Sequence, residues 1–314
     1  MPRFPSPRAL LVVTTALTTG LSAPHTWADD APALRVCMAE NNAPLSYQFK
    51  RDPMKGLDVA LAQAIADHLR RPLRIVPFES ELEDESTLSQ EVNAMLSSDV
   101  CDVASGFPLL HQDLGKPTKE VSRTPEYPGA KRYRERPWIT LGTLINSRPY
   151  QASAMTLVVI DPRWAQLSLQ DIGDARLGAT AGTLSGAATM MFNGGQWRSR
   201  VVNLSRDDDP LVAVDSGQVD AVLVSQSRLD NWRRKHADSQ VRSTGYLHPM
   251  RLNIGLVALD SQQAIIDAAS AVISQAQSSG DLARWAAASG VTYLQPEEPH
   301  VSFGPNMASL MQAK

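Results

Sequence analysis

The residues best suited to holding a small molecule follow the first predicted strand. The segment 40–47 (ENNAPLSY) combines a carboxylate in Glu40, amides in Asn41 and Asn42 and an aromatic ring in Tyr47. Amides donate and accept hydrogen bonds, and a ring supplies an apolar wall. Because ligands bind beyond the carboxyl ends of strands in open parallel sheets, the segment predicts one wall of a cleft. A turn whose Asn side chains bond their own backbone is the alternative.

Two further groups of residues extend the predicted cleft. Ser105, Gly106 and Phe107 end another predicted strand and are expected to form the opposite wall, with a simple loop entry as the alternative. Thr183 and Ser185 begin a predicted helix. Free N–H groups at a helix N-terminus, together with a hydroxyl, favour an anion such as a ligand carboxylate. A plain helix N-cap uses the same groups and is compatible with that function.

Motifs for enzymatic chemistry are missing from the sequence. It contains no G-x-S-x-G, no H-E-x-x-H and no P-loop, and residues 182–186 (GTLSG) have the wrong spacing for a nucleophile elbow. The acidic stretch 79–85 (ESELEDE) lacks the Gly turn and the alternating carboxylates of a cation site. We therefore expect a binding protein with no catalytic residues, no metal and no cofactor.

Composition and the N-terminus indicate an exported, water-soluble chain. Its 314 residues, 43% of them hydrophobic, can bury a core, and a net charge of −3 argues against nucleic acid as a partner. Residues 1–28 read as a signal peptide, with Arg3 and Arg8 before the apolar run 9–21 and an A-x-A-like site at 26–28. That run is shorter than the ~20 residues of a membrane span. The expected compartment is the bacterial periplasm, and removal of Arg3 and Arg8 changes the net charge to −5.

In an oxidising compartment, two cysteines favour a disulfide. Cys37 lies in the predicted strand 34–39, and Cys101 opens the predicted strand 101–106. Neighbouring parallel strands would bring the two Cα atoms to the required separation. Two free buried thiols are the alternative.

The elements that must position these residues alternate along the chain. Leu57, Leu61, Ile65 and Leu69 recur every four residues, which predicts one apolar stripe on a helix over 57–69. The predicted strands are 34–39, 73–78, 101–106, 176–181, 200–204, 220–225 and 252–258. The predicted helices are 57–69, 87–100, 185–192, 209–217, 226–237 and one or two within 262–290.

This order predicts an α/β fold of two lobes, each a mostly parallel sheet flanked by helices. Two crossover strands near 151–160 and 252–258 are expected to form the hinge. The predicted organisation is a signal peptide (1–28), lobe 1 (33–152) with an insertion (111–146), lobe 2 (161–251), a return to lobe 1 (252–298) and a C-terminal tail (299–314). The basic run 131–136 (KRYRER) makes the insertion either a solvated loop or a docking surface for a partner protein.

Three segments in the right order resemble family 3 periplasmic solute-binding proteins. Residues 56–66 (GLDVALAQAIA) are similar to that family's G-[FY]-D-V-D-L-A-x-A-I-A, residues 168–183 to its S-L-x-D-L…R-V-G-V-x-x-G-T, and residues 216–222 (SGQVDAV) to its S-G-x-V-D-A-V. The resemblance covers residues 34 to about 290. It implies the type II periplasmic binding fold and capture of a small polar ligand for an inner-membrane ABC permease.

A narrower resemblance concerns the MxaJ/XoxJ type. Residues 34–37 (LRVC), 41–45 (NNAPL), 101–106 (CDVASG) and 147–150 (SRPY) are similar to segments of these proteins. This resemblance implies an accessory protein that serves a periplasmic PQQ-dependent (quinoprotein) alcohol dehydrogenase through its surface. Cyclohexadienyl dehydratases, enzymes that reuse the same fold, are a minor alternative.

The sequence departs from amino-acid binders at two positions. Residues 107–111 (FPLLH) lack the T-x-x-R whose Arg grips a ligand carboxylate, and Gln226 stands where the family has an Asp for the ammonium group. A standard α-amino acid is therefore not the expected ligand. Arg148 is the expected replacement anchor, and Gln226 and Tyr150 complete the candidate ligand contacts. The chain is expected to act as a monomer.

Overall fold

The structure, a computed structural model, describes residues 1, 31–50, 52–80 and 87–311. Every helix and strand described here lies within a single unit, Pro32–Lys314. Apart from Met1, the predicted signal peptide lies outside the described residues, as does most of the acidic stretch 79–85. Both therefore stay predictions.

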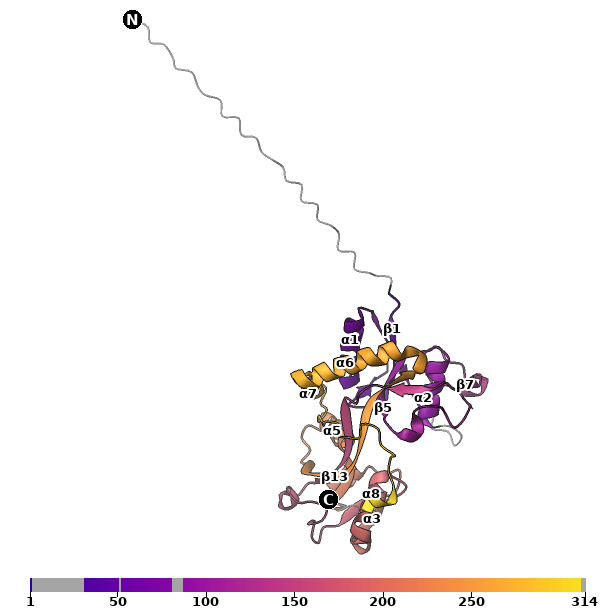
Figure 1. The fold of residues 1–314 in the computed structure, drawn as a ribbon. Coiled ribbons are helices and arrows are strands. Elements are labelled where there is room, and N and C mark those ends of the chain that lie inside the picture. The colour runs from indigo at the N-terminus through magenta and orange to yellow at the C-terminus, as the bar shows by residue number, and fades with distance from the viewer. Residues whose placement is uncertain (2–30, 51, 81–86, 312–314) are drawn as a thin grey trace. The chain divides into compact units, whose positions relative to one another are not determined.

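A nine-stranded sheet runs through this unit in the order β11-β10-β12-β9-β13-β5-β1-β4, with β8 paired to β13 (Figure 1). β4 and β5 are parallel to β1, and β11 and β12 are parallel to β10, whereas β9 and β13 run antiparallel to their neighbours. The α/β fold with two crossover strands is thereby confirmed. The strands are β1 (Leu34–Ala39), β4 (Leu73–Phe78), β5 (Val103–Pro108), β8 (Leu144–Asn146), β9 (Gln151–Val159), β10 (Leu177–Thr180), β11 (Val201–Leu204), β12 (Ala221–Ser225) and β13 (Arg242–Leu259).

We call the part around β1, β4 and β5 the first lobe. Alternate residues of β1 face opposite sides of the sheet, so Val36 and Met38 join the core under α1 while Cys37 joins the core under α2. The stripe predicted on α1 is correct, because Leu57 and Leu61 are fully buried. In Figure 1, α6 lies across α1. The helices of this lobe are α1 (Leu57–Leu69), α2 (Leu88–Ser97), α6 (Gln263–Ser279) and α7 (Asp281–Ala288).

The part around β10, β11 and β12 is the second lobe. Val222 and Val224 of β12 face α4 and α5, whereas Leu223 faces α3, so helices cover both faces here too. The C-terminal segment returns to this lobe, where its helix α8 lies beside α3 (Figure 1). Leu310 of α8 is buried in the same core cluster as Ala188 of α3. The helices are α3 (Leu184–Gly195), α4 (Pro210–Asp215), α5 (Gln226–Lys235) and α8 (Met307–Met311). The predicted lobe boundaries stay predictions.

Several predicted boundaries are wrong. β13 begins ten residues before the predicted strand 252–258, because Gly245, Pro249 and the register shifts around Leu247 interrupt the apolar pattern in its first part. The helix predicted over 185–192 matches the helical part of α3, because the backbone angles of residues 192–194 within it are not helical.

The insertion 111–146 has more regular structure than a polar loop. It contains η1 (His111–Asp113), β6 (Val121–Ser122), η2 (Tyr133–Glu135), β7 (Ile139–Thr140) and β8. β6 pairs antiparallel with β7, and both contact α2 (Figure 1). Asn93 of α2 accepts from the Gly142 N–H at 3.0 Å and donates to its carbonyl at 2.8 Å. The insertion is therefore anchored to the first lobe.

The disulfide between Cys37 and Cys101 is confirmed. β1 and β5 are adjacent and parallel, with Val36 opposite Val103. This places the Cα atoms of the two cysteines 5.8 Å apart, with both side chains buried. The bond therefore ties the residues before β5 to the middle of β1.

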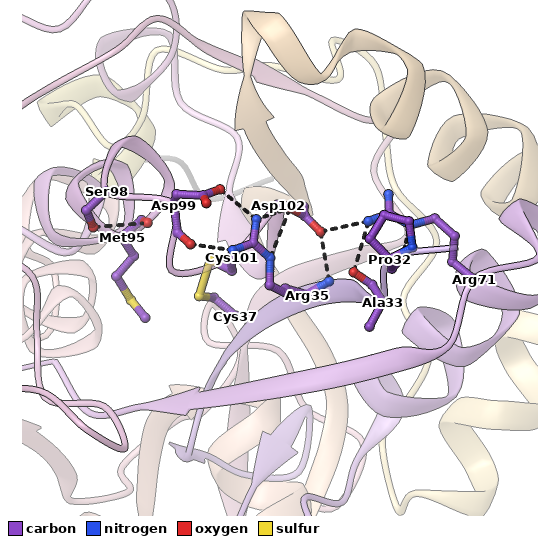
Figure 2. Close-up of polar contacts among 10 residues, drawn as sticks. All are labelled: Pro32, Ala33, Arg35, Cys37, Arg71, Met95, Ser98, Asp99, Cys101 and Asp102. Carbon is purple, nitrogen blue, oxygen red and sulfur yellow. Dashed lines mark hydrogen bonds and ion pairs between the residues drawn. A yellow bond between two sulfur atoms is a disulfide. The ribbon is translucent and has the colours of Figure 1, made fainter. Parts of the chain in front are cut away.

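An ion-pair network lies beside this disulfide. Figure 2 shows Asp102 between Arg35 and Arg71. The Asp102 carboxylate is 6% exposed and accepts from the Arg35 backbone N–H at 2.9 Å, from the Arg35 Nη2 at 2.5 Å and from the Arg71 Nη2 at 3.2 Å. Arg71 also donates to the carbonyls of Pro32 and Ala33. The network fixes the start of the described fold to the loop before β5.

Replacing Asp102 by Asn is expected to lower the free energy of unfolding by about 2 kcal/mol, because Arg71 loses its charged acceptor and Arg35 keeps only the exposed Asp99. Urea unfolding measures this. Asp52→Asn is the matched control, because the Asp52–Lys55 pair, with atoms 4.0 Å apart, is more than half exposed on both sides. Equal losses in the two variants would contradict the prediction.

Candidate ligand-binding cleft

A pocket of about 370 Å³ lies between the two lobes. The first lobe contributes the ends of β1, β4 and β5, the crossover strands contribute residues 151–153 and Ile254, and the second lobe contributes the start of α5. Its polar lining residues are Asn41, Asn42, Ser80, Ser105, Gln151, Ser153, Gln226, Ser227, Asp230 and Thr292. A pocket that combines apolar walls with a few convergent polar groups is suited to a small polar ligand.

Half of the candidate residues line this pocket. The loop after β1 folds as a short hairpin, in which β2 (Asn41–Asn42) pairs with β3 (Ser46–Tyr47). The Ser46 hydroxyl donates to the Ala39 carbonyl at 2.7 Å, which ties the hairpin to the end of β1. The lining candidates are Asn41, Asn42, Ser105, Gly106, Phe107 and Gln226. Their role as ligand contacts stays a prediction.

Thr183 and Ser185 line an adjoining pocket of about 190 Å³, which shares Ser153 with the first. Thr183 is the N-cap of α3: its Oγ1 accepts from the Gly186 N–H at 3.0 Å and donates to the Thr180 carbonyl at 2.8 Å. The capping function is therefore correct. Anion binding at the same helix end stays a prediction.

Arg148 is not brought to the pocket. Its side chain is exposed and absent from the described lining, and its backbone N–H donates to the Ser270 hydroxyl of α6 at 3.1 Å. Helix α6 packs against α1 on one face of the sheet. Arg148, whose backbone is bonded to α6, therefore lies on the outer side of the first lobe. The predicted anchor for an anionic ligand is therefore misplaced. The sequence did not determine the orientation of this side chain, since an Arg just before a crossover strand can point to either face of the sheet.

Glu40 and Tyr47 lie beside the pocket rather than in it. Burial, followed by the charges of Glu79 and Glu126, raises the pKa of the Glu40 carboxyl. The Tyr47 ring lies 4.4 Å from the Arg234 guanidinium of α5. This cation–π contact joins the first lobe to the second at the edge of the cleft.

Tyr150 is fully buried beneath the pocket, in a network with Asp58. The Tyr150 hydroxyl donates to Asp58 Oδ1 at 2.6 Å and accepts from the Gly106 N–H at 3.1 Å. The Ser105 hydroxyl, which faces the pocket, donates to Asp58 Oδ2 at 3.0 Å. Tyr150 therefore positions the pocket wall and does not contact the pocket itself.

Burial dominates the electrostatics of this network. It raises the pKa of Asp58 to about 6, although the hydrogen bonds from Tyr150 and Ser105 oppose the shift. Burial also raises the pKa of Tyr150 well above its usual value, and the charge of Asp58 adds to this. Asp58 was missed in the sequence, where it looks like an ordinary acidic residue in the first turn of a helix.

Asp230 is the main residue that the sequence reasoning missed. It is 4% exposed and is the single charged side chain among the described residues that line the 370 Å³ pocket. Its carboxylate accepts from the Gln226 Nε2 at 2.9 Å and from the N–H and hydroxyl of Thr292, both at 2.7 Å. The spacing of the two residues could have indicated the Gln226–Asp230 contact, since positions 226 and 230 lie on one face of a helix.

Arg228 is a cation of the cleft that the sequence reasoning also missed. It lines the 190 Å³ pocket and a third pocket of about 450 Å³, and its Nη2 lies 3.3 Å from Asp209. The third pocket shares Asn41, Asn42 and Ser227 with the first. The three pockets are therefore parts of one cleft, with a carboxylate in one part and a guanidinium in another.

Metal clusters and membrane-spanning helices are absent from the described residues. Residues 31–50, 52–80 and 87–311 hold no cluster of three or more His, Cys, Asp or Glu side chains that could bind a metal ion. No helix in the same ranges has the length and apolar character to cross a membrane.

Several solved structures share this fold. The L-cystine solute receptor of Neisseria gonorrhoeae, in its unliganded open conformation, is 16% identical over 85% of this chain and 97% of its own, with a TM-score of 0.58. Substrate-binding domain 2 of GlnP from Lactococcus lactis, also open, is 15% identical over 82% and 94%, with a TM-score of 0.58. An ancestral cationic amino acid solute-binding protein is 16% identical over 81% and 93%, with a TM-score of 0.55.

Identities this low establish the fold alone. The chain has the two-lobed α/β fold of these binding proteins, as the sequence predicted. No protein-family model matches the sequence, and no curated protein does either.

Proposed function

We propose that the chain is a periplasmic solute-binding protein, which captures a small polar ligand between its lobes and delivers it to an ABC-type transporter. The observation that carries this proposal is the 370 Å³ pocket, to which both lobes contribute polar side chains. A ligand that contacts both walls stabilises the closed arrangement, which is how hinge-bending binding proteins respond to ligand. The three similar structures described above are themselves named as solute- or substrate-binding proteins.

Asp230 gives the proposed ligand a chemical character. The groups that hold its carboxylate are an amide, a backbone N–H and a hydroxyl, all neutral, so no cation among the described residues pairs with its charge. A buried uncompensated charge is costly, and a cationic group on the ligand would lower that cost. We therefore infer that the ligand carries an ammonium or guanidinium group that approaches Asp230.

A thermal-shift screen tests the proposal. The panel is L-arginine, L-lysine, putrescine, succinate and glucose. A true ligand at 100 times its Kd stabilises by about 2.7 kcal/mol, and a cationic member is expected to do so. No stabilisation by any of these or related small polar compounds would contradict the proposed function.

Asp230→Asn is expected to weaken binding of the cationic ligand by about tenfold to a hundredfold, because the charge opposite the ligand is lost. Isothermal titration calorimetry measures this. Asp215→Asn is the matched control, since Asp215 is an exposed carboxylate of the same lobe outside the pockets described. Unchanged affinity in a folded Asp230→Asn protein would exclude the role of Asp230 while leaving the transport function standing.

A second candidate function is that of an accessory protein of a PQQ-dependent alcohol dehydrogenase, as the MxaJ/XoxJ resemblance implies. The observation that favours keeping it is the disulfide, which joins two of the segments that carry the resemblance. Co-purification with such a dehydrogenase, combined with no response to small ligands, would favour it. For the minor dehydratase alternative, turnover of prephenate or arogenate is the test.

A further inference from the structure

We propose that the insertion 111–146 carries a docking surface for a partner protein that presents a cluster of carboxylates. The surface consists of Arg123, Lys131, Arg132, Arg134 and Trp138, and we call it the insertion surface. It is distinct from the ligand cleft, because none of these five residues lines any of the three cleft pockets. The proposal is therefore independent of the solute-binding function.

The insertion differs in charge from the chain as a whole. The insertion contains seven Lys or Arg and four Asp or Glu, an excess of +3, whereas the whole chain carries −3. A basic patch on an otherwise acidic protein creates a directed field, which steers an acidic partner to one face.

The exposed cations of the surface are free to pair with another molecule. The side chains of Lys131, Arg132 and Arg134 are exposed, and none of them forms an ion pair within the described part of the chain. Some exposed Arg side chains elsewhere pair with acidic neighbours, such as Arg163 with Asp161 and Arg176 with Asp220, whereas others have no ion pair among the described residues. These three cations therefore have no ion-pair partner among the described residues, and Glu135 is the one exposed carboxylate within their run 131–136.

Aromatic rings lie beside a guanidinium group of the insertion surface. The Arg123 guanidinium lies 4.4 Å from the centroid of the Trp138 ring and 5.3 Å from that of Tyr133. Trp138 is 48% exposed, although its ring is among the largest apolar groups of the chain. Trp and Arg are the residue types most enriched at the energetic centres of protein interfaces, which favours a protein as the partner.

The surface is held rigidly by a buried arginine. Arg136 is 4% exposed, donates to the carbonyls of Lys131 at 2.6 Å and Thr124 at 3.0 Å, and forms an ion pair with Glu126. The backbone of Glu126 in turn pairs with Glu79 at the end of β4. A preorganised surface loses less conformational entropy on binding than a flexible loop does.

A nucleic acid or an anionic membrane fits these observations less well. Both carry extended negative charge, which is unfavourable beside a chain whose own net charge is −3. A folded acidic partner can restrict its carboxylates to a patch of matching size.

The test uses the full mature chain and immobilised poly-L-glutamate as the probe, in about 50 mM salt, where surface charges are weakly screened. Lys131→Glu, Arg132→Glu and Arg134→Glu are combined in one variant. The matched control reverses the same number of exposed cations elsewhere, with Arg74→Glu, Arg198→Glu and Arg233→Glu. A third variant is Trp138→Ala, which leaves the charge unchanged. Far-UV circular dichroism and thermal unfolding verify that each variant is folded.

The insertion variant is expected to bind the probe at least about tenfold more weakly than the control variant, and Trp138→Ala about threefold more weakly than the unmodified chain. Equal losses in the two charge variants would overturn the proposal, since only net charge would then matter. Tighter binding to duplex DNA or to phosphatidylglycerol vesicles than to poly-L-glutamate would also overturn it. So would dimers of the chain that the insertion variant abolishes, because the occupant would then be a second copy.

Discussion

Reduction of the Cys37–Cys101 disulfide is expected to lower the free energy of unfolding by about 4 kcal/mol. The bond joins residues 64 positions apart, so its loss frees a long loop in the unfolded chain, and the loop-closure entropy gives this magnitude. Both cysteines are buried, which leaves little room for the native structure to relax and recover the loss. Urea unfolding with and without dithiothreitol measures the effect, because the chain has no other cysteine.

Cysteine replacement separates the cross-link from the packing of the sulfur atoms. Cys37→Ala combined with Cys101→Ala removes both, whereas reduction removes only the bond. The double variant is therefore expected to be less stable than the reduced protein, by the small transfer and cavity cost of two buried sulfurs. A difference below about 1 kcal/mol between oxidised and reduced protein would show that the reduced chain keeps this loop closed by other contacts.

The disulfide also shows which features a sequence determines well. Periodic apolar residues predicted α1, and the buried strands β1 and β12 were predicted from sequences that are mostly apolar. The strands of Cys37 and Cys101 were expected to be parallel neighbours, and the observed adjacency of β1 and β5 brings the cysteines together. Predictions of this kind depend on local patterns and on general topology.

The cleft was harder to predict, because its lining depends on the side to which a side chain points. The segment after β1 and the end of β5 were correctly placed at a strand end, so Asn41 and Ser105 line the pocket. Arg148 and Tyr150 were not, because the turn before β9 directs them away from it. Asp230 was missed because its importance comes from Thr292, which lies 62 residues further along the chain.

The short strands of the insertion could not be predicted from the sequence. β6 and β7 are two residues each, too short for an alternating pattern to be recognised. Their order depends on contacts with α2 and on the buried Arg136, whose role cannot be told from a run of six mostly basic residues. Long-range contacts of this kind decide whether a polar segment is a loop or a structured surface.

Asp58 should make the protein lose stability as the pH rises from about 4 to about 6. Burial raises its pKa to about 6 in the folded chain, from an ordinary value of 3.8. Between these two values the folded state binds more protons than the unfolded state, so the free energy of unfolding falls as the pH rises. A shift of about two units corresponds to about 3 kcal/mol, which is present below pH 4 and lost by about pH 7.

Asp58→Asn isolates this contribution, because Asn stays neutral while its amide can still accept from Tyr150 and donate to Ser105. The pKa values of Asp99 and Asp220 are lowered by their Arg partners, so these carboxylates increase the free energy of unfolding as the pH rises. Their contributions are the same in both proteins and cancel in the comparison. The stability of the variant relative to the unmodified chain is therefore expected to rise by about 3 kcal/mol between pH 4 and pH 7, as measured by urea unfolding at each pH. Asp67→Asn, an exposed carboxylate on the same helix, should show no such trend. A difference independent of pH would mean that Asp58 is already ionised at pH 4, and that the pocket wall at Ser105 is held by a permanent charge.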